Sequence, residues 1–169
     1  MRTMTSVAAG TWTVDLTHTR AAFRARHLLG QTVHGTITLT MGTVEVGQDG
    51  RPQRFHATLD PASIDTAHAR RDADLRGKRF LAVDAHPLME IASNRIVATA
   101  DGWYADAVLR GRGREAPLRI DATLESGGAQ RLQVSGSARL DLRDLGIRVP
   151  GFLVRRFVDV SVSAQATRS

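Results

Sequence analysis

Alternation of apolar and polar residues is the feature of this sequence that most restricts its fold. Within residues 33–41, Val33, Gly35, Ile37, Leu39 and Met41 alternate with polar residues. This period of two residues is typical of a strand that buries one face. The same alternation occurs in 12–16 and 21–26, which together give one strand, and in 55–59, 89–93, 103–109, 118–124, 132–142 and 158–164, and 44–46 extends the second strand. The pattern predicts about eight strands.

Short turns between these segments indicate an antiparallel arrangement. Gln48-Asp49-Gly50, Asp101-Gly102 and Gly127-Gly128 are typical hairpin turns. Eight such strands form either a sandwich or a closed barrel, and closure removes the exposed edges. Small residues on the inward rows leave room inside, as in barrels that hold one small ligand. The sequence therefore favours an all-β, eight-stranded antiparallel barrel with a hollow interior.

One long segment, between Pro61 and Pro87, lacks the alternation. Asp65 or Thr66 is suited to cap the N-terminus of a helix, and Gly77 stands where a C-terminal cap is expected. We therefore predict one helical segment, inserted between strands over about residues 64–82.

Within this segment Ile64, His68, Arg71 and Leu75 are spaced to share one helix face. A guanidinium group that faces a core must be paired or must reach water. Arg71 is therefore expected to be at least half-buried and paired with a carboxylate, Asp72 or one from a facing strand. His68, Arg71 and Asp72 are candidates for a head-group site or for a clamp that holds the segment to the barrel.

The inward rows predict the wall of an apolar cavity. His27 is in register with Phe23 and Ala25, so it either offers a hydrogen bond to a ligand or is an ordinary core histidine. The predicted cavity wall consists of Phe23, Ala25, His27, Ile37, Leu39, Leu59, Leu75, Phe80, Met89, Ile91, Ala107, Leu109, Leu118, Ile120, Ala138, Leu140 and Val160.

Composition limits the chemistry that this chain can perform. It contains no cysteine, which excludes disulfides, thiolate nucleophiles and sulfur-ligated zinc. No two histidines have a metal-ligand spacing, and Ser63, Asp65 and His68 lack the strained turn of a hydrolase nucleophile. Asp72 and Asp74 point to different helix faces, and the Arg-Gly run 110–114 has no phosphate-loop context. We expect no enzyme activity, no metal and no cofactor.

Charge and length set the remaining expectations. The formal net charge is +6, and Lys78 is the one lysine among 23 basic residues. The 169 residues predict a flexible N-terminus over 1–10 and one domain over 11–166. The first ten residues lack the apolar run of a secretory signal, which predicts a cytoplasmic location. The basic residues are scattered without interleaved aromatic residues, so no nucleic acid is expected as a partner, whereas transient contact with a membrane surface stays open.

Several motifs resemble those of a known family. The run from Ile64 to Arg76, followed by Phe80-Leu81 and His86-Pro87, resembles the hallmark segment of the YceI-like family of lipocalin-like, polyisoprenoid-binding proteins. Further similarities are Trp12-Thr13-Val14-Asp15, His18, Phe23, Arg26-His27-Leu28, Leu109-Arg110-Gly111 and Ala116-Pro117-Leu118.

The resemblance covers about residues 11–166. It implies a lipocalin-like barrel whose long apolar pore holds an isoprenoid chain and is closed on one side by the helical segment. It also implies a homodimer without enzymatic activity. An apolar cluster, Phe152, Leu153 and Val154, would lie at the dimer contact or at the pore mouth.

We therefore expect this protein to bind, store or transport a long apolar ligand, such as an isoprenoid quinone, a polyprenyl lipid or a fatty-acyl lipid. Two alternatives stay open at this point. One is a basic surface module that binds an anionic membrane or nucleic acid. The other is a cofactor-free isomerase or cyclase that acts on an apolar substrate.

Overall fold

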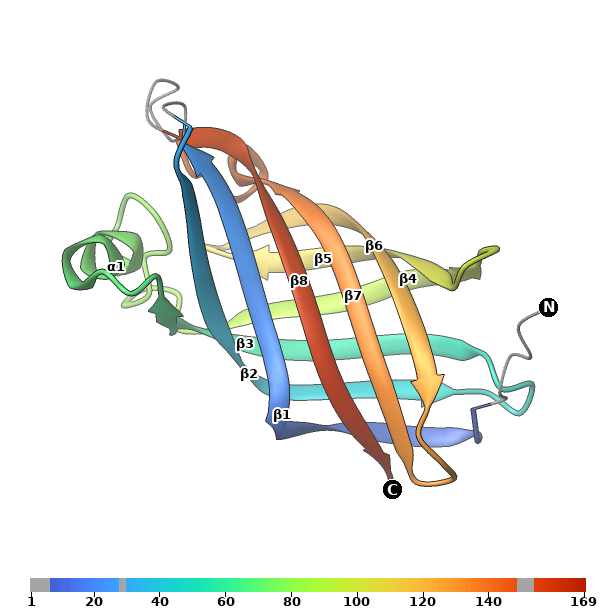
Figure 1. Cartoon of the computed structure of the whole chain (residues 1–169). Coiled ribbons are helices and arrows are strands. Elements are labelled where there is room, and N and C mark those ends of the chain that lie inside the picture. The colour runs from blue at the N-terminus through green and yellow to red at the C-terminus, as the bar shows by residue number, and fades with distance from the viewer. Residues whose placement is uncertain (1–6, 28–29, 149–153) are drawn as a thin grey trace.

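The barrel is closed and consists of eight antiparallel strands, each hydrogen-bonded to its neighbours in sequence, with β1 next to β8. The structure is a computed structural model that describes residues 7–27, 30–148 and 154–169. Figure 1 shows the strands side by side around the barrel. Their bounds are β1 Gly10–His27, β2 Thr32–Val46, β3 Pro52–Asp65, β4 Met89–Ala98, β5 Trp103–Gly111, β6 Arg114–Ser126, β7 Arg131–Asp141 and β8 Val154–Arg168.

The predicted fold class and strand number are confirmed. Alternation marks the strands well because one side chain in two faces the barrel interior. The strands are longer than the alternating segments, however. β1 is continuous over Gly10–His27, although its register shifts between Asp15 and Arg20. Irregular pairing within this strand interrupts the alternation of apolar and polar residues between 16 and 21.

The helical segment is shorter than predicted. Helix α1 spans Ala69–Arg76, because β3 continues as far as Asp65, which pairs with Thr36 of β2. Its N-cap is His68, so the prediction of Asp65 or Thr66 was wrong, whereas Gly77 is the C-cap as predicted. Among the described residues, no helix is long and apolar enough to cross a membrane.

A second short helical element was not predicted. The 3-10 helix η1, Leu142–Leu145, follows β7, and Gly146 ends it in the left-handed conformation at φ 71°. Both α1 and η1 lie at the same end of the barrel as the end of β3 and the start of β4, opposite the C-terminus (Figure 1). We call this the helix end.

Two apolar clusters occupy the two ends of the barrel. At the end opposite α1, which we call the packed end, Trp12 and Leu132 are each 1% exposed. The whole packed-end cluster comprises Val7, Trp12, Val44, Val46, Leu132 and Ala166. At the helix end the buried cluster is Met89, Leu109, Ala116, Leu118, Leu140, Leu145 and Ile147.

Candidate ligand cavity

A cavity of about 400 Å³ lies inside the barrel. All eight strands contribute to its wall, and α1, η1 and the segment after α1 complete it. This volume falls within the range of about 300–1,000 Å³ found for ligand pockets. Trp12 and Leu132 of the packed end are not on the wall, because they fill the barrel there.

Small inward residues explain why the interior is not filled. Ala57 on β3 and Ala138 on β7 face the cavity from strands that are four places apart in the closed sheet. Gly35 plays a different part, because it pairs with Phe23 and a Cβ atom there would clash with the Phe23 ring. The ring thus lies over the glycine and lines the cavity. Side-chain size along the inward rows therefore determines where the lumen is open.

The structure places most of the sequence-predicted wall residues around this one cavity. Those on its wall are Phe23, Ala25, Ile37, Leu39, Leu59, Leu75, Phe80, Met89, Ile91, Leu109, Leu118, Ile120, Ala138, Leu140 and Val160.

Two of the residues predicted for the cavity wall are not placed on it by the structure. Ala107 on β5 is only 2% exposed, pairs with Ser93 and Leu118 on the neighbouring strands, and is not among the residues that line the cavity. The structure thus places Ala107 outside the cavity wall that was predicted for it. His27 belongs to β1 by its backbone, and its side chain lies outside the described residues. Phe152 and Leu153 lie outside them as well.

Some wall residues were absent from the predicted set. Val14, Ile96, Trp103 and Val134 also line the cavity, and all lie in segments with the strand alternation or in direct continuation of it. Leu145 and Ile147 line it from η1 and the turn that follows. No periodic signal marks these last two, because their position depends on how η1 folds back over the helix end.

Thr66 is the centre of the contacts that hold α1 against the barrel. The Arg71 Nε donates to Thr66 Oγ1 at 2.8 Å, and an Arg71 terminal nitrogen donates to the Thr66 carbonyl at 2.9 Å. Asp72 Oδ1 accepts from the Thr66 backbone N–H at 2.9 Å and from the Thr66 hydroxyl. Thr66 and Asp72 are buried, and Arg71 is half-buried.

This arrangement corrects the predicted partner of Arg71. The guanidinium group hydrogen-bonds to a threonine and not directly to a carboxylate, so Thr66 connects Arg71 to Asp72. Hydrogen bonds lower the pKa of Asp72 below its ordinary value, above all the one from the Thr66 side chain, although burial opposes them. Arg76 and Arg71 lower this pKa further through their charges.

His68 has a local role at the start of α1. Its Nδ1 accepts from the Arg71 backbone N–H at 3.2 Å, and its side chain is exposed. Of the three clamp candidates only Arg71 also lines the barrel cavity. The predicted common helix face fails for Ile64 and His68, because both precede the first residue of α1.

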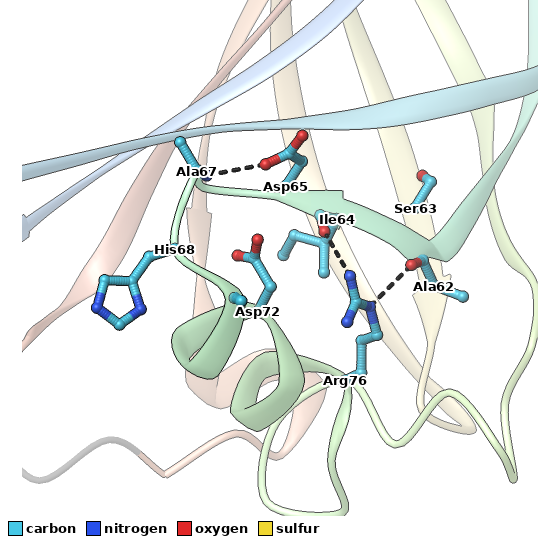
Figure 2. A pocket seen from close by; sticks show the side chains of 9 residues that line it. Ala62, Ser63, Ile64, Asp65, Ala67, His68, Asp72 and Arg76 are labelled. Atoms are coloured by element: carbon cyan, nitrogen blue, oxygen red, sulfur yellow. Dashed lines mark hydrogen bonds between the residues drawn. The ribbon is translucent and has the colours of Figure 1, made fainter.

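A second hollow, of about 450 Å³, lies between α1 and the end of β3 (Figure 2). It is an open groove, and its polar groups are already used. Arg76 donates to the carbonyls of Ala62 and Ile64 at 3.0 and 3.4 Å, and Asp65 accepts from the Ala67 N–H at 2.8 Å. The two bonds of Arg76 attach the helix to the strand, and that of Asp65 stabilises the turn between them, so the groove is the seam between α1 and the barrel.

Arg112 is a further connection that sequence reasoning missed. It lies in the turn between β5 and β6 with φ 52°. Its terminal nitrogens donate to the Leu145 carbonyl at 3.0 Å and to the Lys78 carbonyl at 3.1 Å. Arg112 thereby connects η1 to the segment after α1. A sequence motif gives no sign of this bridge, because its acceptors are backbone carbonyls far away in the chain.

Ser63, Asp65 and His68 do not form a hydrolytic site, because each is held by its own local hydrogen bond. Ser63 Oγ donates to the Asp60 carbonyl, Asp65 accepts from Ala67, and His68 caps α1. Within residues 7–27, 30–148 and 154–169, no three histidine or acidic side chains converge on a position that could hold a metal ion.

The comparisons with known sequences agree with this geometry. A family model described as the YceI-like domain matches residues 12–166. A UPF0312 protein of Serratia proteamaculans is 25% identical over 158 residues, which cover 90% of this chain and 82% of that relative. A UPF0312 protein of Pseudomonas savastanoi is 30% identical over 143 residues, covering 79% of this chain and 73% of the relative.

Solved structures share the fold at low identity. BcnA of Burkholderia cenocepacia has a TM-score of 0.82 at 15% identity and covers 91% of this chain and 99% of its own. A polyisoprenoid binding domain from Saccharophagus degradans, implicated in plant cell wall breakdown, has a TM-score of 0.74 at 12% identity, with 96% of this chain and 100% of its own covered.

Proposed function

The chain belongs to the YceI-like family, and on that premise we propose that it binds a long apolar molecule inside its barrel and stores or carries it without chemical change. The observation that carries the proposal is the internal cavity of about 400 Å³. Its wall consists almost entirely of aliphatic and aromatic side chains, so it excludes water-soluble ligands and favours hydrocarbon.

Burial of hydrocarbon is sufficient for tight binding in such a cavity. Each methylene group removed from water contributes about 0.8 kcal/mol. A stretch of about ten carbons would contribute about 8 kcal/mol before the cost of ordering the chain is subtracted. No polar anchor is required within the lumen. The cavity therefore selects for the tail of the ligand more than for its head group.

Linear lipids fit this proposal best. The structural neighbour from Saccharophagus degradans is described as a polyisoprenoid binding domain. By that analogy, isoprenoid quinones and polyprenyl lipids are the first candidates, and fatty-acyl lipids share with them a long apolar tail. We propose this whole class as ligands, with the tail in the barrel.

Narrowing the cavity from opposite walls tests the proposal. The double variant Ala57→Phe and Ala138→Leu replaces two cavity-facing alanines, on β3 and β7, by larger apolar side chains that occupy part of the cavity. The open lumen should take up the added side chains while the barrel stays folded. A matched control, Thr123→Phe and Gln165→Leu, enlarges two exposed positions adjacent to cavity-facing residues.

The readout is organic extraction of each purified protein followed by mass spectrometry, with circular dichroism to check the fold. The wild type and the control should retain the same apolar molecule, and the narrowed variant should lose most of it. The same molecule in the same amount in a folded narrowed variant would show that the ligand does not lie in the barrel.

A further inference from the structure

The positive charge of the protein is concentrated at one end of the barrel. The helix-end segments 66–88, 112–114 and 142–148 contain nine lysines and arginines but four aspartates. The packed-end turns 47–51, 99–102 and 127–130 contain one arginine and two aspartates. Because the formal net charge of the chain is +6, the helix end accounts for most of it. The named helix-end segments therefore carry a formal charge of +5, from nine cations and four aspartates, whereas the packed-end turns carry −1, from one arginine and two aspartates.

Several of these cations are available to a partner. Arg70, Lys78, Arg79 and Arg148 are exposed. None of the ion pairs between described residues includes them. Leu88, in the same end of the molecule, is 54% exposed although it is a large apolar residue. Unpaired cations at the same end of a protein as an exposed apolar side chain are typical of a membrane-surface contact.

The charged segment is also part of the cavity wall. Leu75 and Phe80 line the cavity, while Arg70, Lys78 and Arg79 stand close to them in sequence with their side chains exposed. A surface that attracts these cations would therefore lie directly against the element that covers the lumen. The exposed cations and the cavity wall therefore belong to the same segment, so binding of a surface to the cations can affect access of the ligand to the cavity.

We propose that the helix end docks on an anionic lipid surface, where the apolar ligand enters and leaves the barrel. The inference rests on the proposed function, because exchange with a membrane is meaningful only for a lipid-like ligand. An anionic bilayer fits better than nucleic acid, since it provides both negative charge for the arginines and an apolar phase for Leu88 and for the ligand. Base stacking would need aromatic residues among the cations, and Arg70 to Arg79 contain none.

Vesicle binding tests this docking surface. Sedimentation is measured with phosphatidylcholine vesicles that contain or lack phosphatidylglycerol. The test variant is Arg70→Gln, Lys78→Gln and Arg79→Gln. The matched control, Arg51→Gln, Arg131→Gln and Arg168→Gln, removes the same charge from exposed residues at the packed end.

Each basic residue near an anionic membrane strengthens binding severalfold at low salt. Removing three of them together should therefore lower the partition coefficient between vesicles and solution roughly 100-fold. We expect this loss for the helix-end variant and little change for the control. Equal losses in both variants, wild-type binding that does not depend on phosphatidylglycerol, or preferential binding of duplex DNA over these vesicles would each overturn the inference.

A parallel measurement separates this inference from the proposed function. Uptake of a fluorescent fatty acid is followed without vesicles, where docking is not needed. Normal uptake together with absent vesicle binding refutes the docking surface alone. If the folded wild type takes up no probe and yields no extracted lipid, the proposed function fails, whatever the vesicles show.

Discussion

The two ends of the barrel are closed by different kinds of interaction. The packed end is closed by apolar side chains, with Trp12 1% exposed and its Nε1 donating to the Ala8 carbonyl at 2.9 Å. Next to α1, the helix end is closed by hydrogen bonds and charges around Thr66, Arg71 and Asp72. A separate apolar cluster supports the side of the helix end beneath η1.

This difference suggests a division of labour between stability and access. Apolar packing is lost in large steps when a side chain is removed and depends little on pH. Hydrogen bonds to charged groups contribute less each and depend on protonation. A cover attached in the second way can open without unfolding the barrel. The following predictions test whether the two ends behave so differently.

The largest effect is expected at the packed end. Trp12→Ala removes a buried ring and leaves a cavity, which should lower the free energy of unfolding by about 3 to 5 kcal/mol. Chemical denaturation measures this loss. Trp12→Phe should cost less, because most of the apolar packing is kept. Leu88→Ala is the control, with a change within about 0.5 kcal/mol because this side chain is largely exposed. Similar losses for Trp12→Ala and Leu88→Ala would contradict the assignment of stability to this end.

A smaller loss of stability is expected for Arg71→Ala. It removes two hydrogen bonds from a charged donor to Thr66. Each such bond contributes about 1.5 to 3 kcal/mol when buried, but Arg71 is only half-buried and water replaces part of the loss, so we expect about 1.5 to 3 kcal/mol in total. Release of a bound fluorescent fatty acid should become faster, whereas in Trp12→Phe it should stay close to the wild-type rate. Arg71→Lys should not restore the wild type fully, because lysine lacks the planar fork that reaches both Thr66 oxygens. If Arg71→Ala destabilises as much as Trp12→Ala without a change in release, the polar cover is not separate from the barrel.

Acid should loosen the helix end through Asp72. Its pKa is lowered in the folded protein by Thr66 and by the nearby arginines, so the ionised carboxylate stabilises the fold above the ordinary pKa. That stabilisation is lost as the pH falls below about 4 towards the lowered pKa. Asp72→Asn should therefore reduce stability at neutral pH and flatten its decline in acid. Thermal melts from pH 7 to pH 2.5 measure the stability at neutral pH and its decline in acid. The control is Asp74→Asn, because Asp74 is an exposed residue of the same helix.

The same division explains what the sequence could predict. Strands such as β2 were predictable because alternation is a local pattern that directly reflects which side chains face inward. The start of α1 was not, because β3 continues to Asp65 only through its pairing with β2. The partner of Arg71 was missed since a threonine carries no charge that suggests an ion pair. The position of Ala107 depends on the bulk of residues on neighbouring strands, which alternation within one strand does not contain.

The smallest effect on stability and on ligand release is expected from Asp15, a carboxylate that belongs to neither end of the barrel. Asp15 lies where the register of β1 shifts, with Thr17 and His18 beside it. The Thr17 hydroxyl donates to Asp15 Oδ1 at 2.6 Å, and His18 Nδ1 lies 2.8 Å from Oδ2. These bonds, first that of the Thr17 side chain, lower the pKa of Asp15 to about 2. Titration of its carboxyl carbon by NMR should give this value, and Thr17→Val should raise it more than His18→Ala does.

Asp15 also serves as the internal control for the acid response of the helix end. Its lowered pKa means that any stabilisation is present above the ordinary value of 3.8 and disappears as the pH falls towards about 2. The site is on the surface of the barrel and covers no opening, since the Asp15 and His18 side chains are 34% and 59% exposed. Asp15→Asn should therefore leave the rate of ligand release at pH 4 unchanged, whereas Asp72→Asn should raise it. Equal changes in the two variants would mean that acid acts on the whole barrel, and that the cover at the helix end has no separate response to pH.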